Sequence, residues 1–573
     1  MRYHVLAADY DGTLATHGKV PPATIAAVRR LKASGRKLVL VTGRELKDLF
    51  EIFPDHELCD RIVAENGALI YRPATKEIRT LVEAPPPAFA EQLIRRIGGA
   101  VGVSVGHVIV ATWQPYEQVA LELIQEMGLE LQIIFNKGAV MILPSGVNKA
   151  VGLTAALEEL GISPRSCAGV GDAENDHAFL AISECAVAVA NALAPLKERA
   201  DVVTGGSHSQ GVTELIEQMI RDDLKTLEPF LARHEVELGR RLDDNQPVKI
   251  APYRSPILLA GSSGGGKSTL ATALIEGLTA NGYQCCIIDP EGDFRDLPIM
   301  RALGDAQRPP PPAEVLALLE RSTDNLAVSL IGLPFADRAQ YFETLLPHLY
   351  EMRARTGRPH WIFVDETHHV APVRRQPSGL ALPPEPHNLV FITVRPSRVA
   401  PSLLATVGTG FFLGSEAHDA LAELAHAKGI EVPPLKGPLP ETGQALAWSA
   451  DHPKEPFLFQ SRTPTSERRR HVRKYATGEL EPERSFYFRG PEKKLNLRAH
   501  NLDLFIQMAN GVDDETWQFH LQQGDYSRWF REGIKDPELA EEAREIEASD
   551  AIAPSESRER IRNAIESRYT AAA

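Results

Sequence analysis

The sequence is poor in cysteine and contains no long hydrophobic run. Five cysteines occur among 573 residues, and none lies in a CxxC pair or has the spacing of a zinc site. This composition excludes a disulfide scaffold and is typical of a reducing compartment. No stretch approaches 18 consecutive apolar residues, and "MRYHVLAADYDG" lacks the basic and apolar regions of a signal peptide. We therefore expect a cytoplasmic protein with no membrane partner.

Positive charge is also in short supply. The chain has 62 Lys and Arg against 76 Asp and Glu, which gives a formal net charge of -14. A chain with this negative charge is not expected to have the extended basic surface that binds nucleic acid non-specifically. Any contact with DNA or RNA is therefore expected to be local. The most basic stretch is 462–474, which includes "SERRRHVRK". It is the best candidate for a polyanion contact, with a solvated linker as the alternative.

Short apolar runs that end in Gly or Asp alternate with amphipathic helical patterns along most of the chain. This alternation predicts an α/β fold with parallel sheets, helices on both faces, and ligands at the carboxyl ends of the strands. We expect two tandem three-layer Rossmann-like units and a C-terminal, mainly helical module. The expected boundaries are 1–222 for the first unit, 223–249 for a helical connector, 250–450 for the second unit, and 451–573 for a basic linker and the helical module.

Two carboxylates follow the first apolar run, in "AADYDGT". Asp9 and Asp11 are two residues apart at the expected end of a strand, where both can reach one phosphorus atom. One carboxylate can attack while the other protonates the leaving oxygen and later activates water. A cluster of negative charge that binds an anionic phosphate requires a cation, and Mg²⁺ suits a site built from oxygen ligands.

Three later motifs complete the expected phosphate site. Thr42 in "LVLVTGR" can hold a phosphate oxygen, and Lys149 in "GVNKA" can neutralise charge on the nucleophile and the phosphoryl group. Asp172 and Asp176 in "GVGDAEND" can complete the metal site. The order of these motifs along the chain, more than any one of them, favours a phosphatase.

These residues resemble the haloacid-dehalogenase superfamily of phosphatases over roughly residues 1–222, and "ENGALI" and "GDAENDHAFL" are similar to its Cof-type branch. The resemblance implies that Asp9 forms an aspartyl-phosphate and that Asp11 is the general acid and base. It further implies that Thr42 and Lys149 hold the phosphoryl group. Mg²⁺ would be ligated by Asp9, the Asp11 carbonyl and Asp172. The side chains of Asn175 and Asp176 would support that metal site.

An insert separates Thr42 from Lys149. Residues of about 84–146 have the pattern helix, two strands, helix, two strands. This pattern is similar to the small open-faced α+β cap (subclass IIB) of the same branch, which roofs the site. The resemblance implies a small phosphorylated substrate, with His107, Trp113 and Lys137 as candidates for the cap face.

A second phosphate-binding motif begins the second unit. "GSSGGGKS" satisfies GxxxxGK[ST] and lies between an apolar run and a helical pattern, as a P-loop requires. Backbone N–H groups of such a loop wrap the phosphates of ATP, the lysine reaches the outer phosphates, and the serine binds Mg²⁺. The expected nucleotide-binding residues are Gly261, Gly264, Gly265, Gly266, Lys267, Ser268 and Thr269.

The motif "WIFVDETHHV" indicates what the nucleotide is used for. Asp365 ends an apolar run and is expected to hold the Mg²⁺ ion through a water. Glu366 follows directly and is placed to polarise an attacking water, which favours hydrolysis of ATP over transfer of its phosphate.

The second unit resembles the HerA-type translocase ATPases, a RecA-like family that assembles as rings. The resemblance covers about residues 250–450 and is carried by "CCIIDPEGDF", "DETHHV" and "FITVRPSRVAPSLLATV". It implies self-association. Where relatives commonly carry "TQRP", this chain has Thr393-Val394-Arg395-Pro396, which leaves the usual sensor function open. Arg395 and Arg398 are candidates for contacting a phosphate across a subunit boundary.

The sequence therefore favours a bifunctional hydrolase. One part is an Mg²⁺-dependent phosphomonoester hydrolase that uses an aspartyl-phosphate, and the other is an ATP-hydrolysing motor or switch with DNA as a candidate partner. The first alternative is a kinase-phosphatase that acts on nucleic-acid ends or small metabolites. The second is an assembly scaffold gated by ATP and carrying a phosphatase head.

Overall fold

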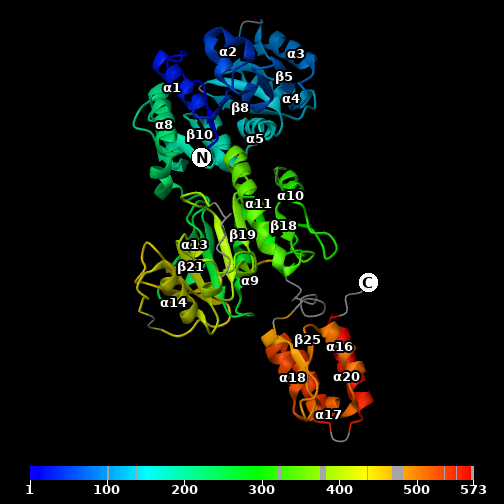
Figure 1. The fold of residues 1–573 in the computed structure, drawn as a ribbon. Coiled ribbons are helices and arrows are strands. Elements are labelled where there is room, and N and C mark those ends of the chain that lie inside the picture. Colours follow the sequence, from blue (N-terminus) through cyan, green and yellow to red (C-terminus); the bar gives the residue numbers. More distant parts are fainter. Residues whose placement is uncertain are drawn as a thin grey trace.

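The computed structural model describes residues 1–99, 102–136, 138–320, 324–373, 382–434, 437–466, 480, 482–534, 536–549 and 552–569. The predicted mixed α/β class is confirmed: two large sheets are flanked by helices. Figure 1 shows the first unit at the top in blue to green, the second below it in green to yellow, and a helical module in orange to red. Within the described part of the chain, every helix is too short or too polar to cross a membrane.

The first sheet has the strand order β12-β11-β10-β1-β2-β3-β4-β5. The strands from β12 to β3 are parallel, and β4 and β5 are antiparallel additions at one edge. The buried apolar runs of β1, β2 and β10 place β1 at the centre, where the chain order reverses and ligands bind in such folds. The strands are β1 Val5–Ala8, β2 Lys37–Val41, β3 Arg61–Ala64, β4 Leu69–Arg72, β5 Glu77–Thr80, β10 Cys167–Gly171, β11 Cys185–Ala188 and β12 Val202–Val203.

The helices of this unit cover the sheet and position its loops. Among them, α1 packs against α8, and α5 packs against β2 and β3. The helices are α1 Pro22–Ala33, α2 Leu46–Ile52, α5 Lys149–Glu159, α6 His177–Ile182, α7 Ala194–Arg199 and α8 His208–Asp222, with short 3₁₀ turns η1 Pro54–Leu58, η2 Glu65–Gly67, η3 Pro164–Ser166 and η4 Glu174–Asp176.

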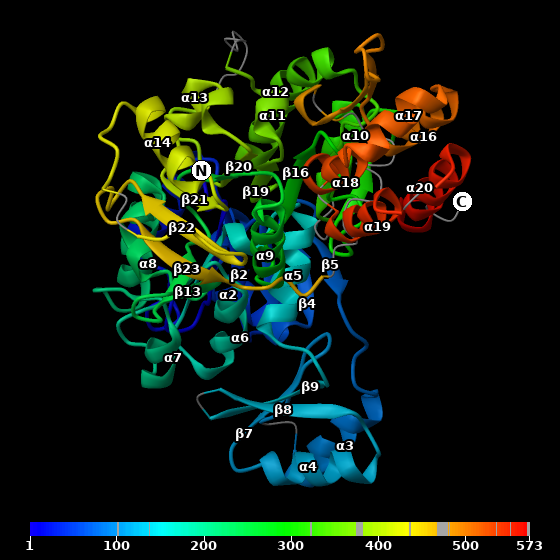
Figure 2. The same ribbon diagram turned by 90° about the horizontal axis from the view of Figure 1, so that it is seen from below.

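A small α+β insert lies between β5 and α5. Its antiparallel sheet has the order β6-β7-β9-β8, and its helices α3 and α4 pack against one another. Phe89, Leu93, Leu123 and Ile142 form part of its own buried core. Figure 2 shows the insert extending away from the first sheet. Its elements are α3 Pro87–Ile97, β6 Ser104–Val105, β7 Val110–Trp113, α4 Glu117–Glu126, β8 Leu131–Asn136 and β9 Ala139–Pro144.

The second sheet has the order β14-β13-β23-β22-β21-β15-β20-β19-β16-β18-β17. Strands β21 to β17 in this order are parallel, and β22, β23, β13 and β14 extend one edge in antiparallel pairing. The strands are β13 Val236–Arg241, β14 Pro247–Ile250, β15 Ile257–Gly261, β16 Cys285–Asp289, β17 Arg301–Leu303, β18 Leu326–Ser329, β19 Trp361–Val364, β20 Leu389–Thr393, β21 Thr409–Leu413, β22 Gln444–Ser449 and β23 Phe457–Ser461.

Two hydrophobic clusters cover the faces of this sheet. The central strands β15, β16, β19 and β20 are buried along their whole length, as expected for parallel strands between helical layers. The helices are α9 Lys267–Ala280, α10 Pro312–Leu319, α11 Phe335–Thr356, α12 Thr367–Val370, α13 Pro401–Leu404 and α14 Ala417–Lys428, with a 3₁₀ turn η6 Pro396–Arg398.

The prediction of a helical connector at 223–249 is wrong. This segment contains one 3₁₀ turn, η5 Lys225–Phe230, followed by β13 and most of β14. Pro229 interrupts the helical pattern, and β13 pairs with β23, a strand more than 200 residues later in the chain. The cross-strand hydrogen bonds override the local helical spacing, so the second sheet begins before residue 250 and ends after residue 450.

The C-terminal module is small and mainly helical, with a core of aromatic side chains. Phe505, Trp517, Tyr526 and Phe530 are buried in it, and Trp517 stacks on Tyr526 with ring centroids 4.4 Å apart. Its elements are η7 Pro482–Arg484, β24 Phe486–Phe488, β25 Leu497–Ala499, α16 Leu502–Gly511, α17 Asp514–Gln522, α18 Asp525–Trp529, a π-helix η8 Phe530–Ile534, α19 Pro537–Glu547 and α20 Pro554–Tyr569. Residues 467–474 of the basic stretch lie outside the described residues.

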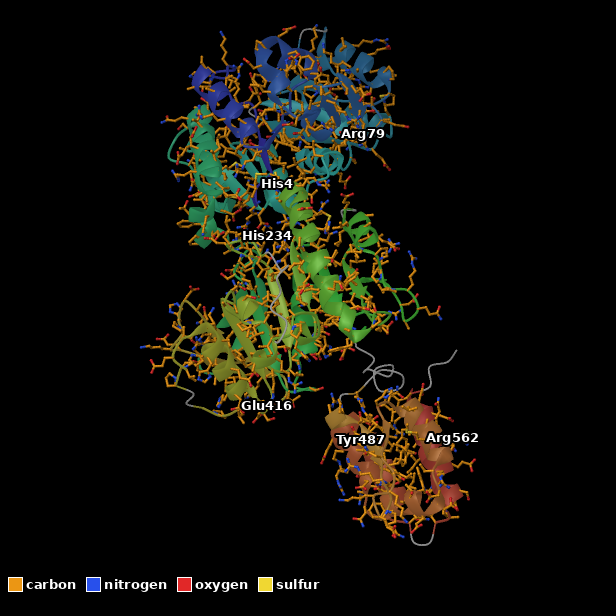
Figure 3. The ribbon with its side chains drawn as sticks, in the orientation of Figure 1. His4, Arg79, His234, Glu416, Tyr487 and Arg562 are labelled. Carbon is orange, nitrogen blue, oxygen red and sulfur yellow. The ribbon has the colours of Figure 1, made fainter. Side chains whose placement is uncertain are left out.

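The first and second units meet along a buried polar junction. His4 of the first unit hydrogen-bonds through Nε2 to the carbonyl of Ala354 near the end of α11, at 3.0 Å. Gly357, which ends α11 with a left-handed φ of 78°, approaches Ser166 so closely that a Cβ there would lie 2.0 Å from its Oγ. Figure 3 labels His4 and His234 in this junction. The close approach leaves no room for a side chain at residue 357.

Candidate phosphatase and nucleotide sites

Three buried carboxylates meet at the carboxyl ends of the neighbouring strands β1 and β10. One oxygen from each of Asp9, Asp172 and Asp176 lies within 4.8 Å of the others. Asp9 follows β1 directly, and Asp172 follows β10, with Ala8 paired to Val170 in the sheet register. The parallel sheet therefore brings together carboxylates from motifs that lie more than 160 residues apart.

Lys149 joins two of these carboxylates. Its Nζ atom donates to Oδ1 of Asp9 and to Oδ1 of Asp176, each at 2.6 Å, and the lysine side chain is 1% exposed. The position of Lys149 is set by the preceding residue, because the Asn148 side chain caps α5 by accepting from the N–H groups of Ala150 and Val151. The lysine consequently projects into the site from the first turn of α5.

The cluster carries more negative than positive charge. Burial first, and repulsion from Asp176 second, raise the pKa of Asp9. Burial opposes ionisation of Lys149, but Asp176 and Asp9 together raise the pKa of its ammonium group, so it stays charged. Lys149 thus contacts two of the three buried carboxylates, Asp9 and Asp176. A divalent cation would balance this charge, and the oxygen-only donor set fits Mg²⁺.

Both carboxylate oxygens of Asp176 accept hydrogen bonds. Its Oδ1 accepts from Lys149, and its Oδ2 accepts from the backbone N–H groups of Asp172 at 2.8 Å and Ala173 at 2.9 Å. Thr13 donates to Oδ1 of Asp172 at 3.1 Å. Asp176 is therefore placed to orient both the lysine and the loop that carries Asp172.

Asp11 lies beside this cluster and is held by a residue to which the sequence analysis gave no role. Arg44 donates from Nε and Nη2 to the two oxygens of Asp11, at 2.6 and 2.8 Å. The hydrogen bond to Asp11 raises the pKa of Arg44. Thr42, fully buried at the end of β2, accepts from the Arg44 N–H through Oγ1 at 3.1 Å. The motif "VTGR" contained Arg44. Its spacing could not show that this arginine pairs with Asp11, because the two residues meet only in the folded protein.

The insert is tied to the first sheet by Glu65, a second residue without an assigned role in the sequence analysis. Its fully buried carboxylate accepts from the backbone N–H groups of His107 at 2.9 Å, Val108 at 2.7 Å and Ile109 at 2.9 Å. Glu65 itself has a left-handed φ of 50°. This conformation aims its side chain at the insert, and the motif "ENGALI" contained Glu65 without indicating that contact.

The insert also reaches the loop that follows β2. A Cβ on Gly43 would lie 3.0 Å from Cε of Met141 on β9 and 3.7 Å from Nδ2 of Asn175. Asn175 donates to Oδ1 of Asn66 at 3.1 Å, so it links two loops of the first sheet. Trp113 and His107 are largely exposed, and Lys137 lies outside the described residues.

The P-loop connects β15 to α9 in the centre of the second sheet. Lys267 is 7% exposed and donates to the carbonyls of Gly261 at 2.9 Å and Ser262 at 3.1 Å. Gly261 and Gly266 have left-handed φ values of 148° and 98°, and a Cβ at 261 would lie 2.0 Å from the Leu413 carbonyl. These glycines permit the tight turn that also contains Gly264 and Gly265, and Ser268 and Thr269 lie in the first turn of α9.

Carboxylates gather at the neighbouring strand ends. Asp365 follows β19 and Asp289 ends β16, and burial together with the adjacent acids raises the pKa of both carboxyl groups. Within the described residues, Oδ2 of Asp365 and Oε2 of Glu366 are buried without a hydrogen-bond partner. His368 Nδ1 is 3.5 Å from Oε2 of Glu366. Oxygens left unpaired in this way fit a metal-bound water at Asp365 and a substrate water at Glu366.

Arg395 lies on the surface of the second unit. It donates to Glu416 at 2.9 Å, its side chain is 51% exposed, and that hydrogen bond raises its pKa. Within one chain it is therefore engaged with Glu416. Thr393, which precedes Val394, is fully buried, and its Oγ1 lies 3.2 Å from Nδ1 of His368.

Comparisons with known proteins agree with this division of the chain. The family described as haloacid dehalogenase-like hydrolase matches residues 6–94 and 107–216. The family described as the central domain of helicase HerA matches residues 236–353.

Individual relatives cover the first unit. Phosphoglycolate phosphatase 2 of Saccharolobus solfataricus is 30% identical over 220 residues, which are 38% of this chain and 92% of that protein. The phosphoglycolate phosphatase of Haloarcula marismortui is also 30% identical over 220 residues, 37% of this chain and 95% of that protein. A solved haloacid dehalogenase-like hydrolase from Bacteroides thetaiotaomicron aligns with a TM-score of 0.33 and 19% identity, over 38% of this chain and 99% of that chain.

A parallel sheet with buried carboxylates and a lysine at the carboxyl end of its central strand defines an α/β protein with a ligand site at the strand ends. The chain belongs to the haloacid dehalogenase-like hydrolases, as predicted from the motifs of the first unit. The central domain of the HerA type follows in the C-terminal part of the same chain.

Proposed function

We propose that the first unit is an Mg²⁺-dependent phosphomonoester hydrolase that works through an aspartyl-phosphate. The observation that carries this proposal is the contact of Lys149 with Asp9 and Asp176 beside Asp172. Asp9, Asp172 and the carbonyl of Asp11 would hold Mg²⁺, which would offset the negative charge of the substrate phosphate when bound. Asp176 would orient Lys149 and the loop of Asp172.

In this proposal Asp9 attacks the phosphorus atom, and the bond to the leaving oxygen breaks. Asp11 gives its proton to that oxygen and then takes a proton from the water that hydrolyses the aspartyl-phosphate. Lys149 and Thr42 hold the phosphoryl oxygens, and Lys149 stabilises their charge. Arg44 holds the Asp11 carboxylate in one orientation, and we propose that this contact loosens for proton transfer.

The insert would act as a cap that selects the leaving group. Met141 near Gly43, and Glu65 bound to residues 107–109, support this role because they place the insert beside the phosphate loop. The relatives named as phosphoglycolate phosphatases make 2-phosphoglycolate the first substrate to test. A small phosphorylated acid of this kind suits a small cap.

The second unit is proposed to bind and hydrolyse ATP, with Mg²⁺ held by Ser268 and by Asp365 through a water. The supporting observation is that Glu366, next to Asp365, has a buried oxygen without a hydrogen-bond partner within the described residues. A general base in this position suits attack by water, whereas phosphate transfer to a bound hydroxyl needs no such glutamate. By its likeness to HerA the unit is further proposed to self-associate as a ring and to act on DNA.

Two assays test these proposals. The purified protein is incubated with Mg²⁺ and phosphate monoesters, including 2-phosphoglycolate, and free phosphate is measured; failure to hydrolyse any monoester would refute the phosphatase. In parallel, γ-labelled ATP is offered with nucleic-acid ends and the dephosphorylated products. Release of free phosphate supports an ATPase, a labelled acceptor supports a kinase, and retained intact ATP supports a scaffold gated by binding.

A further inference from the structure

Residues that follow β23 contact the P-loop and its helix α9 at two points. Downstream of β23, the backbone N–H groups of Thr465 and Ser466 donate to the carboxylate of Glu276, each at 2.8 Å. Glu276 lies on α9, the helix that follows the P-loop. Farther along, Arg484 of the module reaches the P-loop itself, with Nη1 3.5 Å from Oγ of Ser263. Figure 1 shows the module on the side of the second unit that carries α9.

Two hydrogen bonds within the module hold Arg484 in place beside the P-loop. Its Nη2 donates to the carbonyl of Gly533 at 2.6 Å, and its own carbonyl accepts from Nε1 of Trp529 at 2.8 Å. Trp529 ends α18, and Gly533 lies on η8, so the arginine is fixed to the folded part of the module. A guanidinium group that is already ordered loses little further freedom when it binds a ligand.

The surroundings of Arg484 are positively charged. A cavity of about 450 Å³ is lined by Arg484 together with three further cations, Arg489, Lys493 and Arg528, against two acids, Asp525 and Glu532. Tyr487, labelled in Figure 3, also lines this cavity. The carboxylates Asp289, Asp365 and Glu366 stand at the ends of β16 and β19 in the sheet that carries the P-loop. A phosphate chain bound at the P-loop would meet the positive charge of Arg484 beside Ser263.

We propose that Arg484 contacts the phosphates of the nucleotide bound at the P-loop, so that the C-terminal module supplies a nucleotide-contacting residue in the same chain and covers the site. Ser263 belongs to the loop whose backbone N–H groups surround the phosphates in proteins with this motif. A guanidinium group beside that loop can donate two parallel hydrogen bonds to phosphate oxygens. The inference rests on the proposed binding of ATP by the second unit.

The test measures ATP and ADP affinity of the full chain by calorimetry for the wild type and four variants. Arg484→Gln is expected to weaken ATP binding by about 10-fold to 100-fold, the loss of one charge-assisted contact. Arg484→Lys should lose less, because it keeps the charge. Arg531→Gln is the matched control, since Arg531 is an exposed arginine on η8 that does not line the cavity. Lys267→Ala reports loss of the P-loop contact itself.

A purely structural role for Arg484 makes a different prediction. Arg484→Gln would then lower the melting temperature of the protein without nucleotide but leave its ATP affinity within about twofold of the Arg531→Gln control, and this outcome would overturn the proposal. If the glutamine variant fails to fold, a loss of ATP affinity in Arg484→Lys beyond that of the Arg531→Gln control would support the contact, whereas equal affinities of these two variants would overturn it. Absence of ATP binding by the wild type would instead refute the proposed ATPase, and this inference with it.

Discussion

The phenolic hydroxyl of Tyr283 donates a 2.7 Å hydrogen bond to Oε2 of Glu184, and both residues are buried. Glu184 directly precedes β11 of the first unit, whereas Tyr283 lies just before β16 of the second. Arg2 donates to the other carboxylate oxygen at 2.5 Å. Hydrogen bonds to a buried charge are stronger than neutral ones, so this pair joins the first unit firmly to the second unit.

Replacing Tyr283 by phenylalanine should weaken that junction. The Tyr283→Phe variant keeps the ring but leaves Oε2 of Glu184 without its phenolic donor, and we expect a loss of about 1–3 kcal/mol in the free energy of unfolding. Denaturant unfolding followed by fluorescence measures this loss. Tyr487→Phe, a half-buried tyrosine of the module, serves as the control. Equal stability of the two variants would contradict a stabilising role for the hydroxyl.

Asp9→Asn should abolish phosphatase activity and leave ATP turnover unchanged. The amide cannot form an aspartyl-phosphate, and the inferred phosphatase groups all lie in the first unit. Release of phosphate from a monoester and from ATP is measured on the same preparation, with and without a chelator for Mg²⁺. Beryllofluoride should form its adduct on Asp9, and mass-spectrometric assignment of the adduct to another carboxylate would show that the nucleophile is misassigned.

Glu366→Gln should separate ATP binding from ATP hydrolysis. The amide keeps the size of the side chain but cannot take a proton from water, so turnover should fall by roughly two to four orders of magnitude while affinity is retained. Lys267→Ala should lose both affinity and rate, because a positive charge on the phosphates is removed. An unaltered rate of phosphate release in Glu366→Gln would argue against hydrolysis assisted by this residue and in favour of a kinase.

Glu65→Gln should loosen the insert. The carboxylate accepts three backbone N–H groups from residues 107–109, and an amide in its place presents one acceptor and one competing donor. Hydrogen exchange at these three amides should speed up by at least about tenfold, because charge-assisted bonds are lost. Glu77→Gln, a change of an exposed glutamate on β5, is the control. Unchanged exchange in Glu65→Gln would mean that other contacts hold the insert.

Acid should destabilise the junction through His360. Burial, followed by the nearby charge of Arg358, lowers the pKa of His360 well below its ordinary value of 6.5, and its Nδ1 accepts from the Gln284 N–H at 2.7 Å. The folded state therefore keeps this ring neutral, while the unfolded chain takes up a proton below about pH 6.5. Stability should fall as the pH drops below that value, by up to about 1.4 kcal/mol per pH unit from this group.

The measurement compares unfolding free energies between pH 7.5 and 5.5 for wild type, His360→Gln and His348→Gln. His348 is an exposed histidine on α11 and should leave the pH slope unchanged. His360→Gln should be less stable at pH 7.5 and show a shallower slope. Parallel slopes in all three proteins would locate the acid sensitivity at other groups.

Much of the fold and of both sites was predictable because the relevant patterns are local. The buried run of β1 before Asp9, the run of β15 before the P-loop, and the run of β19 before Asp365 each stand in a few consecutive residues. Parallel strands place their carboxyl ends at one edge of the sheet. Motifs that follow such strands are therefore expected to lie at that edge, even when the order of the strands is not known. The prediction of a helical connector was wrong for the opposite reason. Strand β13 is specified by its pairing with the distant strand β23 and not by the spacing of its own residues.

The sequence by itself determined the α/β class, the order of the two units and the carboxylates, lysines and glycines that define each phosphate-binding motif. The tertiary structure alone decided which distant residues complete them: Arg44 on Asp11, Glu65 on the insert, Glu184 with Tyr283, and Arg484 beside Ser263, 221 residues away. Hydrophobic periodicity and motif spacing act over a few turns of chain, whereas these contacts form only when strand pairing and side-chain packing have brought separate segments within hydrogen-bonding distance.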